Sequence, residues 1–107
     1  RYPIDVQTIP AFLEQQAYGI RHGITVAGFY YDKNMREEFN RLAERYKGNV
    51  QFLLVRKDIS ANLKPELRLQ PDQPAIRLFY HGTDFGQPYP IANLEDRIEA
   101  IFRGESE

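Results

Sequence analysis

The stretch that decides the fold is Gly23–Val55, GITVAGFYYDKNMREEFNRLAERYKGNVQFLLV. It begins with the β-branched and aromatic run Ile24–Tyr30 and ends with Val50–Val55, which is apolar on both faces. Both runs have the length and composition of buried strands. Between them, apolar residues recur at helical spacing: Met35, Phe39, Leu42, Ala43 and Tyr46. Strand, helix and doubly apolar strand predict a right-handed parallel βαβ unit.

Local signals set the expected ends of the long helix in this unit. Asn34 is the expected N-cap, because Glu37 then occupies the capping-box position. Gly48 is the expected left-handed residue that ends the helix. Charged side chains fill the rest of the helix surface, which indicates a solvated face.

The chain before this unit predicts an edge strand and a helix. The strand lies within Pro3–Gln7, and Thr8 caps a helix that carries Pro10 in its first turn. Gly19 or Gly23 ends that helix. Its predicted apolar face consists of Ile9, Phe12, Leu13, Ala17 and Ile20.

The chain after Val55 predicts a short helix, a hairpin and a final helix. The expected segments are a connection at Lys57–Asn62, a helix at Leu63–Leu69, a two-proline turn at Gln70–Pro74, a strand at Ala75–Tyr80, a hairpin turn at His81–Asp84 and a proline-interrupted edge strand at Phe85–Ile91. In the strand Ala75–Tyr80, polar Arg77 is expected on the face opposite Ile76 and Leu78. Asn93 is expected to cap the last helix, whose stripe is Leu94, Ile98, Ile101 and Phe102.

Composition limits the class of protein. A chain of 107 residues with 42% hydrophobic residues predicts one domain over residues 1–107. A net charge of −1 gives no electrostatic reason to expect a nucleic-acid or membrane partner. The start at Arg1, without a methionine, is expected for a processed protein or for a domain taken from a longer chain. The absence of cysteine excludes disulfides, thiol catalysis and thiolate metal sites within this chain.

The predicted order β-α-β-α-β-α-β-β-α, with a mixed central sheet flanked by helices, resembles the thioredoxin fold of the α/β class. The resemblance rests on Ala27–Tyr30 before the long helix and on Gln73–Ala75 before the hairpin. It implies that Pro74 follows a cis peptide bond. Redox-active members carry a CxxC near Asn34–Glu37, where this chain has no cysteine, and the buried aspartate of the family falls at Gly28.

A narrower resemblance concerns the segment Gly28–Asp32 followed by a helix with Phe39 and Ala43. It is similar to the non-catalytic b-type domains of protein disulfide isomerases. This resemblance implies a redox-inactive, chaperone-related scaffold and, for the parent protein, the lumen of the endoplasmic reticulum.

No residue pattern predicts catalysis, a cofactor or a metal. His22 and His81 have no histidine or cysteine at helical spacing, and the acidic residues are explained by caps and solvation. The expected site is instead a polypeptide-binding surface beside the proline turn. At its edge, the free N-terminus of the long helix would favour a polar or anionic guest. The expected site residues are Tyr30, Tyr31, Asp32, Met35, Asp72, Gln73 and Pro74.

Two alternatives remain at this point. The first is a structural spacer that contacts neighbouring domains of the same protein, and it requires an apolar patch elsewhere on the surface. The second is a cysteine-free enzyme that acts through Tyr30 or Tyr31, and it requires a pocket in which other groups converge on one of these hydroxyls.

Overall fold

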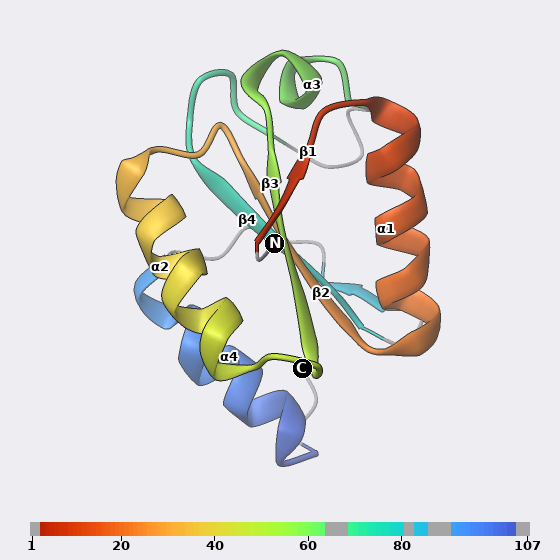
Figure 1. Ribbon diagram of the computed structural model, residues 1–107, viewed down its shortest axis with the longest axis vertical. Helices are drawn as coiled ribbons and strands as arrows, with labels where there is room; N and C mark the ends of the chain where they lie inside the picture. The colour runs from red at the N-terminus through yellow and green to blue at the C-terminus, as the bar shows by residue number, and fades with distance from the viewer. Residues whose placement is uncertain (1–2, 64–68, 81–82, 86–90, 105–107) are drawn as a thin grey trace.

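The computed structural model describes residues 3–63, 69–80, 83–85 and 91–104. Its centre is a five-stranded sheet with the strand order β1-β3-β2-β4-β5 (Figure 1). The strands are β1 (Ile4–Val6), β2 (Ile24–Phe29), β3 (Val50–Val55), β4 (Ala75–Tyr80) and β5 (Thr83–Phe85). The helices are α1 (Ile9–His22), α2 (Lys33–Arg45), α3 (Lys57–Ala61) and α4 (Leu94–Phe102).

The central βαβ unit forms as predicted. β2 and β3 pair in parallel, with Val26 opposite Phe52, and α2 connects them. β1 extends the sheet in parallel on the far side of β3, which confirms the edge strand expected near the N-terminus. β4 pairs antiparallel with β2, and β5 pairs antiparallel with β4, so the sheet is mixed.

Two apolar layers cover the two faces of the sheet. α2 and α4 lie on one face and α1 lies on the other (Figure 1). Because successive strand residues point to opposite faces, each strand contributes to both layers. The α2/α4 layer contains Ile24, Val26, Met35, Phe39, Leu42, Ala43, Tyr46, Val50, Phe52, Leu54, Ile76, Leu78, Leu94, Ile98 and Ile101. The α1 layer contains Val6, Phe12, Ala27, Phe29, Leu53, Val55 and Phe79.

The predicted N-cap of α2 is wrong by two residues. The helix begins at Lys33, and Asp32 is its cap: Asp32 Oδ1 accepts a hydrogen bond from the Met35 amide at 2.8 Å. Asp32 competes successfully because a carboxylate at this position also interacts favourably with the positive end of the helix dipole. At the other end, Gly48 has the predicted left-handed conformation, with φ of 87°.

The helix faces differ from prediction at two positions. Leu13 of α1 is 49% exposed and Phe102 of α4 is 48% exposed, although both belong to predicted apolar stripes. Phe102 lies at the margin of its stripe, whereas in α1 the buried side of the helix is the side of Phe12, which leaves Leu13 uncovered. Thr8 caps α1 as expected, accepting a hydrogen bond from the Ala11 amide at 3.1 Å. Arg77, predicted on a polar face of β4, is buried because α1 covers that face.

The segment after β3 differs most from prediction. Lys57–Ala61 forms α3 instead of a connection, and the predicted helix at Leu63–Leu69 falls mainly outside the described residues. Thr83 and Asp84 belong to β5 instead of the hairpin turn. Of the predicted edge strand at Phe85–Ile91, residues 86–90 lie outside the described residues and Phe85 belongs to β5; the prediction is wrong at Ile91, because Ile91–Asn93 is a 3-10 helix that leads into α4. Asn93 is the N-cap residue of α4, but its side chain makes no capping hydrogen bond.

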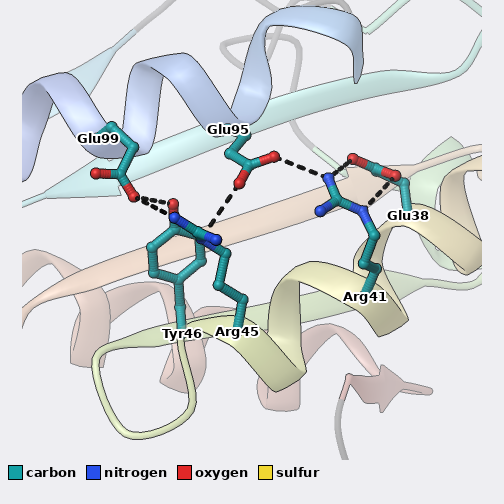
Figure 2. A network of polar contacts seen from close by, with 6 residues as sticks. All are labelled: Glu38, Arg41, Arg45, Tyr46, Glu95 and Glu99. Atoms are coloured by element: carbon teal, nitrogen blue, oxygen red, sulfur yellow. Dashed lines mark hydrogen bonds and ion pairs between the residues drawn. The ribbon is translucent and has the colours of Figure 1, made fainter.

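A network of ion pairs and hydrogen bonds, called the ionic clasp here, connects α2 to α4 along their exposed sides (Figure 2). Its members are Glu38, Arg41, Arg45, Tyr46, Glu95 and Glu99. Arg41 bonds Glu38 on its own helix and Glu95 of α4 at 2.9 Å. Arg45 reaches Glu95 at 3.2 Å and Glu99 at 3.5 Å. The Tyr46 hydroxyl donates a hydrogen bond to Glu99. These contacts set the position of α4 over the sheet.

The clasp predicts a loss of stability in acid that can be assigned to Glu99. The hydrogen bond from Tyr46, together with the charges of Arg45 and Arg103, lowers the pKa of Glu99 below its ordinary value of 4.5. A carboxyl whose pKa is lowered by folding stabilises the fold above its ordinary pKa and loses this contribution as the pH falls through its folded pKa. We expect the free energy of unfolding of Glu99→Gln to lie below that of the parent at pH 7, and the gap to close as the pH falls below 4.5 and through the folded pKa of Glu99. Urea denaturation across this pH range measures both, and a gap that persists unchanged in acid would contradict the assignment.

Candidate functional site

One end of the sheet gathers three segments that are distant in the sequence. β2 and β3 both finish there and β4 begins there, because Phe29 lies opposite both Val55 and Ala75. The loop after β2, helix α3 and the turn before β4 therefore meet at this end, which is at the top of Figure 1. The loop after β2 contains Tyr30 and Tyr31 and is called the tyrosine loop here; the proline turn is Gln70–Pro74. The prediction that these two segments lie at the same end of the sheet is correct.

Tyr30 has an unusual backbone at the centre of this end. Its φ is 50°, in the left-handed region that bulky residues seldom adopt. The Tyr30 amide donates a hydrogen bond at 3.3 Å to Oγ of Ser60, which is buried in α3. The Ser60 hydroxyl in turn donates to the carbonyl oxygen of Val55 at 3.3 Å. Ser60 thus ties α3 to the ends of both β2 and β3 and holds Tyr30 in place.

Two adjoining hollows open on either side of Tyr30. The larger has a volume of about 640 Å³, and the smaller has a volume of about 380 Å³. Tyr30, Lys57 and Asp72 line both hollows, so the two meet at these residues. Arg56, Asp58, Ala61 and Pro71 complete the larger hollow, and Tyr31 completes the smaller one.

Ion pairs within the chain surround the hollows. Lys57 Nζ lies 2.7 Å from Asp72 Oδ1, and both side chains are exposed. The hydrogen bond that Lys57 donates to Asp72, together with the negative charge of Asp72, raises the pKa of Lys57. Asp72 has φ of 59°, a left-handed conformation that aspartate tolerates better than most residues. Next to this pair, Arg56 forms a bidentate ion pair with Asp58, with Nε–Oδ1 at 3.0 Å and Nη2–Oδ2 at 2.6 Å.

Tyr31 belongs to a second polar group beside the smaller hollow. Its hydroxyl accepts a hydrogen bond from Arg36 at 3.1 Å, and the guanidinium lies 5.1 Å from the centre of the tyrosine ring. Arg36 also contacts Asp5 of β1 at 3.2 Å. The Tyr31 hydrogen bond is the main cause that raises the pKa of Arg36.

The structure brings part of the predicted site together. Tyr30, Tyr31 and Asp72 line the hollows as a group, whereas Gln73 and Pro74 are exposed on the neighbouring turn and line neither hollow. Met35 was expected at the surface, and this is wrong: it is 4% exposed and packs in the core beneath Gly28. The helical stripe had already placed Met35 on the buried face of α2.

Asp32 changes the expected electrostatics of the site. Its carboxylate caps the N-terminus of α2, so a carboxylate of the chain itself occupies the position expected to attract an anionic guest. A second anion there would meet like charge. An anionic ligand at the end of this helix is therefore disfavoured.

Sequence reasoning missed the contribution of α3. Arg56, Lys57, Asp58 and Ala61 line the larger hollow, but the segment was interpreted as a connection. The available signal was Asp58, an acidic residue suited to the first turn of a helix. In a helix of five residues, no apolar periodicity could reveal the element.

The described residues contain no group of three or more histidine and acidic side chains placed to hold a metal ion. His81 lies outside the described residues, and the side chain of His22 is likewise outside the description. Among the helices of the described part, none has the length and apolar character needed to cross a membrane.

Comparison with solved structures identifies the fold. A thioredoxin from Trypanosoma brucei brucei superposes with a TM-score of 0.73 at 21% identity, covering 96% of this chain and 95% of that one. A thioredoxin mutant from Entamoeba histolytica has a TM-score of 0.68 at 15% identity, covering 91% and 97%. A designed protein has a TM-score of 0.63 at 16% identity, covering 99% and 96%. No family model and no curated protein sequence matches the chain.

These likenesses define a thioredoxin-like α/β fold, as the sequence predicted. The chain carries this fold without any cysteine. Thiol–disulfide exchange proceeds by attack of a thiolate, so the residues of this chain cannot perform the exchange themselves.

Proposed function

We propose that this domain is a non-catalytic interaction module that binds an extended polypeptide segment across the two hollows beside Tyr30. The observation that carries the proposal is the left-handed backbone of Tyr30, which Ser60 holds at the meeting point of both hollows. Such a conformation costs about 1–3 kcal/mol and persists where surrounding contacts enforce it, commonly at ligand sites.

The size and lining of the hollows suit peptide side chains. Tyr30, Ala61 and Pro71 supply ring, methyl and pyrrolidine surface to the larger hollow. Aromatic residues supply much of the binding energy at protein interfaces. A segment that crosses Tyr30 would place one side chain in each hollow, because residues two apart in an extended chain point the same way.

The spacer alternative receives less support. It requires a contiguous apolar patch away from this end, and the large hydrophobic residues exposed in the described part of the chain are Leu13 and Phe102. They lie on α1 and α4, which cover opposite faces of the sheet (Figure 1). Single exposed apolar residues of this kind are normal for a soluble surface.

The enzyme alternative also receives less support. The Tyr31 hydroxyl accepts its hydrogen bond from Arg36, whose charge is already shared with Asp5. Tyr30 is placed through its backbone amide, and Ser60 contacts that amide and not the tyrosine hydroxyl. In neither of these contacts does the tyrosine hydroxyl donate its proton to a general base, as a catalytic tyrosine would need to.

The binding proposal can be tested by filling the larger hollow. The probe is the acetylated and amidated peptide Gly-Ser-Leu-Phe-Val-Ser-Gly, titrated into isotopically labelled protein and followed by NMR. We expect shifts centred on the amides of Tyr30, Lys57 and Asp72. Ala61→Trp, which adds bulk to the wall of the hollow, should weaken binding about tenfold, equivalent to 1.4 kcal/mol.

Ala92→Trp is the matched control, because Ala92 is also exposed but lies beside α4 and lines a different hollow. It should bind the probe like the parent protein. Equal weakening by the two substitutions, or shifts spread away from Tyr30, would argue against this site. Thermal melts of both variants establish that each is folded.

A further inference from the structure

We propose that Asp72 determines the charge selectivity of this site, by neutralising Lys57 and thereby disfavouring acidic peptide segments. This inference rests on the proposed function and deepens it by naming the class of segment that the site accepts. Lys57 and Asp72 line both hollows, so a segment that occupies both hollows lies beside them.

The contact between these residues is specific to the tertiary structure. Lys57 begins α3, and Asp72 lies in the turn before β4; their charged atoms are 2.7 Å apart. Both side chains are largely exposed, at 73% and 68%, so each remains within reach of a bound peptide. Without Asp72, Lys57 would present an unpaired ammonium group to that peptide.

The neighbouring cations are neutralised in the same way. Arg56 is paired with Asp58, and Arg36 is paired with Asp5. Asp32 adds a negative charge at the start of α2. Of these three pairs of described residues, Lys57–Asp72 is the one in which both members line both hollows.

The conservative variant at this position is Asp72→Asn. Asparagine tolerates the left-handed backbone as well as aspartate does, so the turn keeps its shape while the charge is lost. An exposed ion pair contributes little to stability, so we expect the melting temperature to change little. The variant thus isolates the electrostatic role of Asp72.

The test compares peptides that differ only in charge. The neutral probe Gly-Ser-Leu-Phe-Val-Ser-Gly is set against versions in which both serines are glutamate or both are lysine. The parent protein should bind the acidic peptide no more tightly than the neutral one. Measured relative to the neutral peptide, Asp72→Asn should tighten binding of the acidic peptide about two- to fivefold and weaken binding of the basic one by a similar factor.

Glu44→Gln is the matched control. Glu44, in the last turn of α2, pairs with Lys47 at 3.5 Å, and this pair has comparable exposure. This substitution makes the same change in net charge as Asp72→Asn. If it raised the affinity for the acidic peptide by a similar factor, the effect would come from the net charge of the protein and not from Asp72, and the inference would be overturned. Unchanged selectivity in Asp72→Asn would overturn it while leaving peptide binding intact. If the parent and both variants bind no peptide, both the proposed function and this inference fail.

Discussion

Replacing Phe39 with alanine is expected to lower the free energy of unfolding by about 3–5 kcal/mol. Phe39 is fully buried between α2 and the sheet, and its ring meets Phe52 edge-on with centroids 5.4 Å apart. Domains of this size have total stabilities of about 5–15 kcal/mol, so the loss is a large fraction of the whole. Chemical denaturation followed by circular dichroism measures the change.

Phe102→Ala is the control for this prediction, because it removes the same side chain from the exposed end of α4. The Phe102 ring is half exposed and contacts Tyr46 with centroids 5.8 Å apart. Its loss removes half the burial of a phenylalanine and one ring contact, and should therefore cost about 1–3 kcal/mol, less than the loss of Phe39. Equal costs for the two substitutions would mean that the packing of α2 on the sheet is misassigned.

A methyl group added at Gly28 is expected to destabilise the domain by about 1–3 kcal/mol through overpacking. A Cβ at this position would lie 2.5 Å from Met35 Sδ and 3.1 Å from the nearest atom of the Phe39 ring. Gly28 lies in the middle of the sheet between β3 and β4, so the strand has little freedom to retreat. Denaturation of Gly28→Ala measures this cost directly.

The contact with Met35 can be isolated by a double-mutant cycle. Met35→Ala alone leaves a cavity and should cost about 2–5 kcal/mol. In the double variant the new methyl group enters the vacated space, so the two costs should sum to more than the measured loss by about 0.5–3 kcal/mol. If the losses of the two single variants were additive in the double variant, Met35 would have no steric contact with a side chain at position 28.

The same geometry shows what occupies the space around Gly28. The resemblance places a buried aspartate there, and in this structure the Met35 side chain fills the space that such a residue would need. With no cysteine in the chain, a buried carboxylate would have no thiol to assist and would carry a desolvation cost. A glycine beneath a methionine gives an apolar core instead.

Local rules identified the elements well where a segment had strong periodicity and failed where two signals competed. The stripe of α2 predicted the burial of Met35, Phe39 and Leu42, because residues three and four apart share one helix face. Asp32 and Asn34 are both good capping residues, and the sequence does not show which of them the chain places against the first free amides. Where β2 ends and the chain turns determines which of the two becomes the cap: β2 ends at Phe29 and α2 begins at Lys33, which makes Asp32 the N-cap.

Exposure at the edges of elements could not be predicted for a related reason. Leu13 and Phe102 belong to apolar stripes, but a stripe indicates only the direction of the sheet from each helix, not where the sheet ends. Arg77 is the opposite case, a polar residue that is buried. A strand with alternating apolar and polar residues has a solvent-exposed polar face only if no helix covers that face. Here α1 covers that face.

The sequence by itself determined the class of fold, the central βαβ unit and the absence of thiol chemistry, because these depend on periodicity and on residue types. It also determined that the tyrosine loop and the proline turn share one end of the sheet. Only the tertiary structure decided what that end contains: α3, the Ser60 contact that holds Tyr30, and the pairing of Lys57 with Asp72. The physical reason is that hollows and ion pairs form between segments far apart in the chain, and no local spacing records which of them will meet.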